Sequence, residues 1–312
     1  MKLIKRILLI ILIIIVIITS IFVLLVKHSQ KAVMVSNNYY NEVKAVGILE
    51  RKYTQKGDYD VNFIEYDIIN KNIDKYKIWY PAELESQSNT YPVVIMANGT
   101  GVPASKYKAI FEHLASWGFI VVGNEDGESW NGNSTSQTLD YILSLNDDIN
   151  SIFNQKINID AIGVAGHSQG GVGAINASTN FENSKLFKSI YTASTTHSEL
   201  AAALKWPYDV SKINIPYFMV AGDGKIDSET ITPLSSLEEN FNLLPDNIIK
   251  IMARRKNTDH GEMLANADGY MTAWFLYTLI NNEEASTIFL GDMPELLNNT
   301  NNWQDTVINN IY

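Results

Sequence analysis

Residues 160–176 read DAIGVAGHSQGGVGAIN, an apolar run that breaks at Gly166-His167-Ser168-Gln169-Gly170 and restarts with small residues. The apolar run predicts a buried strand, and the small-residue stretch after it predicts a helix. A serine on a sharp strand-to-helix turn needs a strained backbone, and a glycine two residues to either side lets the two chain segments approach. We therefore predict that Ser168 lies on such a turn, between Gly166 and Gly170, as a candidate nucleophile.

Short apolar runs alternate with helical periodicity along the rest of the chain. Runs such as VVIMA at 93–97 and FIVVG at 119–123 are apolar throughout, as strands covered on both faces must be. The expected strands are 61–69, 75–80, 92–97, 119–122, 161–165, 189–192, 217–221 and 248–253. The expected helices are 105–117, 136–152, 170–179, 234–243 and 269–281. This order predicts an α/β fold, a doubly wound and mostly parallel sheet of about eight strands with helices on both faces.

A serine hydroxyl is a poor nucleophile unless a base accepts its proton and an acid orients that base. Of the five histidines, His260 follows the last predicted strand, where the order serine, acid, histidine requires the base. The strand at 217–221 runs into an acidic loop, in which we favour Asp227 as the acid and keep Asp223 in reserve. The sequence of this loop argues against a calcium site, because it lacks the EF-hand spacing of oxygen ligands. We expect neither a metal nor a cofactor.

Acyl transfer also needs two backbone N–H donors for the oxyanion. Gln169, the residue after the candidate nucleophile, supplies one at the start of the helix. The loop NGTG at 98–101 supplies the other, for which we choose Thr100. Trp130 and Trp206 are candidate substrate-lining residues.

With these residues in view, the chain resembles the α/β-hydrolases, and among them the cutinase-like polyester hydrolases, lipases and chlorophyllases. The resemblance covers roughly residues 60–295. It rests on NGTG at 98–101, HLASWGFIVV at 113–122, GHSQGG at 166–171, IDSETITP at 226–233 and DHG at 259–261. It implies an α/β-hydrolase fold with Ser168 as nucleophile, Asp227 as acid, His260 as base, and the amides of Thr100 and Gln169 as the oxyanion hole.

Three positions depart from the polyester-type members of that family. An aromatic residue is common where Thr100 stands, Met where Gln169 stands, and Trp where His197, a further candidate lining residue, stands. These changes weaken an aromatic clamp on a polymer ring. We therefore expect a serine esterase or lipase acting on small-molecule, lipid or polymer esters, without predicting polyester degradation. A non-catalytic binding module with this fold, or a peptidase or acyltransferase with the same site, remains the alternative.

The N-terminus differs in character from the rest of the chain. Lys2, Lys5 and Arg6 precede an apolar run at 7–26, which as a helix spans roughly 30 Å, the thickness of the bilayer core. A cleaved signal peptide has a shorter apolar region and a small-x-small site. We expect a retained single-pass transmembrane helix over residues 1–27, with the N-terminus cytoplasmic and the remainder extracellular. Secretion after signal cleavage is the alternative.

The charge and composition of the chain restrict the kinds of molecule that it can bind. The chain carries a formal charge of -10 and no cysteine, and without the four positive charges of residues 1–27 the charge is -14. Such an acidic domain is a poor ligand for nucleic acid. We expect a monomer with a polar tether at 28–58 and a catalytic domain at 59–312.

Overall fold

The computed structural model describes residues 33–68 and 73–309. The described residues from Val35 onward form one compact unit. The anchor expected at residues 1–27 lies outside the described residues. Within the described ranges, no helix has both the length and the apolar character needed to cross a bilayer.

A single sheet runs through this unit, and nine strands are seen in its described part. They are β1 (Val61–Asp67), β2 (Lys75–Pro81), β3 (Tyr91–Ala97), β4 (Ile120–Asn124), β5 (Ile157–His167), β6 (Phe187–Ala193), β7 (Tyr217–Gly222), β8 (Lys250–Arg255) and β9 (Trp303–Asn309). Their order across the sheet is β1-β2-β4-β3-β5-β6-β7-β8-β9. Strands β3 to β8 are parallel, whereas β1, β2 and β9 are joined by antiparallel pairs. This arrangement fits the expected α/β-hydrolase fold.

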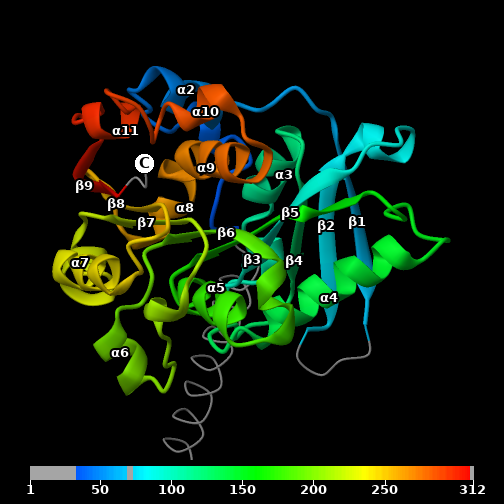
Figure 1. The fold of residues 1–312 in the computed structure, drawn as a ribbon, viewed down its shortest axis with the longest axis horizontal. Coiled ribbons are helices and arrows are strands. Elements are labelled where there is room, and N and C mark those ends of the chain that lie inside the picture. Colours follow the sequence, from blue (N-terminus) through cyan, green and yellow to red (C-terminus); the bar gives the residue numbers. More distant parts are fainter. Residues whose placement is uncertain (1–32, 69–72, 310–312) are drawn as a thin grey trace, which may run out of the picture. The chain divides into compact units, whose positions relative to one another are not determined.

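Helices cover both faces of the sheet (Figure 1). On one face lie α3 (Lys108–Ser116) and α9 (Asp268–Ile280), and on the other lie α4 (Asn133–Asp147), α5 (Gln169–Thr179) and α7 (Leu234–Leu243). Alternate residues of β3 divide between the two cores, Val94 facing α3 and α9 while Val93 and Ile95 face α4 and α5. Because side chains alternate along a strand, β3 is apolar at every position.

All eight predicted strands and all five predicted helices are present, with ends shifted by a few residues. The prediction missed β9, in which only Trp303 is buried and the sequence WQDTVIN has no apolar run longer than two residues. It also missed five short helices, which are α2 (Ile48–Thr54), α6 (Ser198–Ala203), α8 (Met263–Asn266), α10 (Glu283–Ser286) and α11 (Glu295–Asn298).

The segment expected to be a tether needs correction over the residues described, 33–58. Tyr39 and Tyr53 are buried in the core, and α2 packs on α9. Gly269 makes that approach possible, since a Cβ there would lie 2.4 Å from the Thr54 hydroxyl. The polar composition misled the prediction because much of this segment is held by hydrogen bonds.

Glu50 is the centre of those bonds and is 2% exposed. Its carboxylate accepts hydrogen bonds from the Val46 amide (2.7 Å), the Asn302 side chain (2.8 Å) and the Trp303 indole (2.9 Å). The guanidinium of Arg255, also buried, lies 3.6 Å away. A carboxylate with this many donors ties the segment before β1 to the end of the chain.

Replacing Glu50 with Ala should lower the free energy of unfolding by about 3–5 kcal/mol, because it leaves a buried Arg255 without its counter-charge. Urea unfolding measures the loss. Glu42→Ala, on the exposed surface of the same segment, is the matched control and should change the value by less than about 0.5 kcal/mol. Equal, small effects of both substitutions would show that residues 35–58 are not integrated into the domain.

Candidate active site

Ser168 sits between the end of β5 and the start of α5 with φ 60° and ψ −124°. For a residue other than glycine this backbone conformation is strained, and it persists only where the surrounding structure enforces it. The Ser168 amide donates to the carbonyl of Ala193 at the end of β6 (3.0 Å). The predicted strand-to-helix turn is therefore present, and the strain lies at the candidate nucleophile.

The flanking glycines are required by close backbone contacts. A Cβ on Gly166 would lie 2.0 Å from the carbonyl oxygen of Gly170, and one on Gly170 would lie 2.2 Å from that of Ala97. Backbone atoms cannot yield as a flexible side chain can. The turn therefore admits only glycine at both positions, as the sequence pattern predicts.

The structure brings Ser168, His260 and Asp227 together. The Ser168 hydroxyl lies 2.9 Å from Nε2 of His260. On the other side of the ring, Nδ1–H of His260 donates to Oδ1 of Asp227 at 2.7 Å, since a carboxylate can only accept. His260 begins the short helical turn after β8, and Asp227 follows β7. Three loops at the carboxyl ends of parallel strands thus meet at one point, as such sheets favour.

Asp227 is wholly buried, and its second oxygen is also bonded. Oδ2 accepts from the amide of Gly222 (2.8 Å) and from the hydroxyl of Ser194. Ser194 has φ 50° at the end of β6, and sequence reasoning missed it because a serine after a strand carries no signal of its own. The reserve acid Asp223 instead accepts from the Gln304 side chain (3.1 Å), so the geometry favours Asp227.

The loop after β3, which includes Thr100, is packed against the start of α5. Asn98 fixes it, since its side chain donates to the carbonyl of Asp126 (2.8 Å) and accepts from the hydroxyl of Tyr107 (2.7 Å). Across the described residues, the amides of Thr100 and Gln169 have no hydrogen-bond acceptor. The Gln169 amide also lies at the N-terminus of α5, where the helix dipole favours negative charge. Both amides are thus available to an oxyanion.

His167, predicted only as part of the turn, has a defined partner. Its Nε2–H donates to the carbonyl oxygen of His260 at 2.7 Å, and the two rings lie 4.7 Å apart between centroids. Burial, with a smaller contribution from the neighbouring His260, lowers the pKa of His167 to about 4. A neutral His167 therefore holds the backbone of His260 through this hydrogen bond.

The candidate lining residues lie on loops near α5. Trp130 and Trp206 are half-buried, as is His197, whose amide donates to the carbonyl of Ile231 (2.9 Å). Asn176, which sequence reasoning missed, donates from its side chain to the carbonyls of Trp130 (2.8 Å) and Pro207 (3.0 Å). The side-chain amide of Asn176 thus holds two loops beside α5, the helix that follows Ser168. Contact of the lining residues with substrate stays a prediction.

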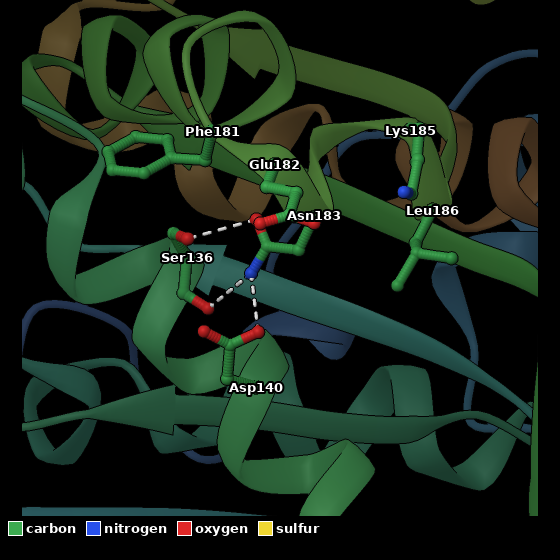
Figure 2. Close-up of a pocket in the computed structure, with 7 residues that line it drawn as sticks. All are labelled: Ser136, Asp140, Phe181, Glu182, Asn183, Lys185 and Leu186. Atoms are coloured by element: carbon green, nitrogen blue, oxygen red, sulfur yellow. Dashed lines mark hydrogen bonds between the residues drawn. The ribbon is translucent and has the colours of Figure 1, made fainter.

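A pocket of about 420 Å³ lies elsewhere, between α4 and the segment before β6 (Figure 2). Three of its polar side chains bond one another, since Asn183 donates to Oδ1 of Asp140 (2.7 Å) and accepts from the hydroxyl of Ser136 (2.9 Å). No predicted site residue lines it. Within the described ranges, no group of three or more His, Asp or Glu side chains is arranged to hold a metal ion.

Two comparisons with known proteins agree with this geometry. The chlorophyllase family model matches residues 51–193. Cutinase est1 of Thermobifida alba is 25% identical over 244 residues, which is 73% of each chain. The chain is thus similar to the chlorophyllases and to this cutinase.

The predicted resemblance is thereby confirmed, and in general terms it supports a carboxylic ester hydrolase. The chlorophyllase match includes the loop of Thr100 and the turn of Ser168 but ends before Asp227 and His260. Asp227 and His260 are therefore placed in the site by their distances alone, 2.7 Å from the acid to the base and 2.9 Å from the base to Ser168.

The lowered pKa of His167 predicts a pH dependence of stability. As pH falls, the unfolded chain binds a proton at this histidine near pH 6.5, whereas the folded chain does so only near pH 4. The contribution of neutral His167 to the free energy of unfolding is therefore complete above pH 6.5. It falls by about 3 kcal/mol as the pH drops from about 6.5 to 4.

Urea unfolding of the wild type and of His167→Gln between pH 7 and 4 measures this contribution. Gln cannot titrate, and its amide N–H can still reach the His260 carbonyl, so the variant should lose less stability on acidification. The same loss in both proteins would contradict the assignment.

Proposed function

We propose that this protein is a membrane-anchored, extracellular serine hydrolase that cleaves carboxylic esters through an acyl-enzyme. The observation that carries the proposal is the chain of two hydrogen bonds from Ser168 through His260 to Asp227, at 2.9 and 2.7 Å. A binding module would have no use for a strained serine aligned with a base and a buried acid.

In the first step, Nε2 of His260 takes the hydroxyl proton as Oγ of Ser168 attacks the ester carbonyl. The carbonyl oxygen becomes an oxyanion and accepts hydrogen bonds from the amides of Thr100 and Gln169. Asp227 stabilises the imidazolium that forms. His260 then donates its proton to the alkoxide oxygen as the carbon–oxygen bond breaks, and the alcohol leaves an acyl group on Ser168.

In the second step, His260 removes a proton from water, and the hydroxide attacks the acyl carbonyl. Collapse of that intermediate releases the carboxylic acid, and His260 returns its proton to Oγ. Losing one oxyanion donor typically costs about 2.7–4 kcal/mol of barrier. The two backbone amides therefore matter as much to the rate as the catalytic side chains do.

Replacing Ser168 with Ala should lower the turnover of short p-nitrophenyl esters by at least about 10⁴-fold, because no other group can form the acyl-enzyme. A fluorophosphonate probe should label the wild type and leave the variant unlabelled. Ser178→Ala, at a serine on the far end of the same helix α5, is the control and should keep both activities.

The outcomes separate the alternatives. Labelling at Ser168 without ester turnover would favour a peptidase or an acyltransferase. An unlabelled wild type would favour a non-catalytic binding module, and turnover retained in Ser168→Ala would contradict the assignment of the nucleophile.

For location, the proposal relies on the basic residues and the apolar run of residues 1–27. The full chain expressed in bacteria should stay with membranes after carbonate extraction and should be degraded by protease added to intact cells. A variant lacking residues 1–27 should do neither. A shortened chain in the medium would indicate signal cleavage, and full protection from protease would reverse the topology.

A further inference from the structure

Asp259, the residue before His260, contacts both loops of the site. Its Oδ1 accepts hydrogen bonds from three backbone amides, those of His260 (2.8 Å), Ile226 (3.0 Å) and Asp227 (3.1 Å). The Ile226 amide also lies 3.2 Å from Oδ2. Oδ1 of Asp259 thus accepts from the backbone amide of the base, His260, and from that of the acid, Asp227, which precedes the base by 33 positions.

These bonds close a ring with the bond between acid and base. The side chain of Asp227 holds the imidazole of His260, and Asp259 holds the backbones of both residues. A shift of one loop relative to the other would therefore stretch the bonds to Asp259 as well as the bond from Asp227 to His260. The spacing of acid and base is therefore set by the backbone as well as by the imidazole.

Local capping does not account for this geometry. Asp259 does cap the short turn that begins at His260, and Glu262 in turn accepts from the Asp259 amide (2.8 Å). A cap explains the bond to His260 alone. The amides of Ile226 and Asp227 belong to another loop and have no other acceptor among the described residues.

The approach of the two loops also depends on Gly224. A Cβ at this position would lie 2.5 Å from Cβ of Asp259. The acid loop is thus shaped to bring its amides onto this carboxylate. Burial acts to raise the pKa of Asp259, but the three amide donors and the nearby His260 outweigh it and hold the pKa below its usual value. The carboxylate is therefore ionised at neutral pH.

We propose that Asp259 is a positioning residue for catalysis, which fixes His260 relative to Asp227 by accepting the amides of both loops. This role rests on the proposed function, since it acts through the base. A displacement of about 1 Å at a catalytic group can lower the rate by about 10²-fold.

The test compares Asp259→Ala and Asp259→Asn with the wild type on p-nitrophenyl butyrate. In Asp259→Ala, kcat should fall about 10- to 100-fold with KM changed by less than about twofold, because Asp259 bonds the loops of the base and the acid and is not a candidate substrate-lining residue. In Asp259→Asn, kcat should stay within about fivefold of the wild type, since an amide oxygen caps backbone N–H groups nearly as well as a carboxylate.

Asp209→Ala is the matched control. Asp209 also caps a short helical turn, accepting from the Ser211 amide (3.1 Å), and among the described residues its side chain bonds only Ser211 and Lys212, which belong to that turn. Its loss should leave kcat unchanged. Hydrogen exchange of the Ile226 and Asp227 amides, followed by NMR, gives a readout that needs no activity, and it should accelerate in Asp259→Ala and not in Asp259→Asn or Asp209→Ala.

Wild-type kcat in Asp259→Ala would overturn the proposal, as would a folded Asp259→Asn that is as slow as Asp259→Ala. If Asp259→Ala does not fold, Asp259→Asn and its amide exchange decide. An inactive wild type would contradict the proposed function, and amide exchange would then test only whether Asp259 bonds the loop of Asp227. Unchanged exchange of the Ile226 and Asp227 amides in a folded Asp259→Ala would show that it does not, and would overturn the proposed positioning role.

Discussion

The strained backbone of Ser168 is the constraint on which the rest of the site depends. Ser168 has a φ of 60° where β5 meets α5, and carbonyl oxygens of α5 and of the end of β3 lie only about 2 Å from where side chains at Gly166 and Gly170 would begin. The surrounding sheet supplies the stability that offsets this strain. On this turn between β5 and α5, the Ser168 hydroxyl lies 2.9 Å from Nε2 of His260.

The imidazole must in turn be held against a loop from a different strand. Asp227 fixes one ring nitrogen, and its own second oxygen is bound by Ser194 and Gly222. His167 supports the backbone of the base from beneath, and Asp259 joins the backbones of base and acid. Each of these contacts restricts movement of a group whose position governs the rate, so the site is organised before substrate arrives.

The sequence predicted the features that one segment determines by itself. Apolar runs and alternating apolar residues located eight strands, and the glycines around Ser168 located the turn. The segment at 28–58 was misread over its described part because the buried Glu50 is bonded by residues near the end of the chain, such as Asn302 and Trp303. Ser194 and Asp259 escaped for the same reason, since their partners lie about 33 positions away.

A crystal structure of the protein treated with a fluorophosphonate measures the central claim most directly. The account predicts a bond from phosphorus to Oγ of Ser168, with the phosphoryl oxygen about 3 Å from the amides of Thr100 and Gln169 and Nε2 of His260 within hydrogen-bond reach of the adduct. Phosphorus on another residue, or on Ser168 with its oxygen turned away from both amides, would contradict it.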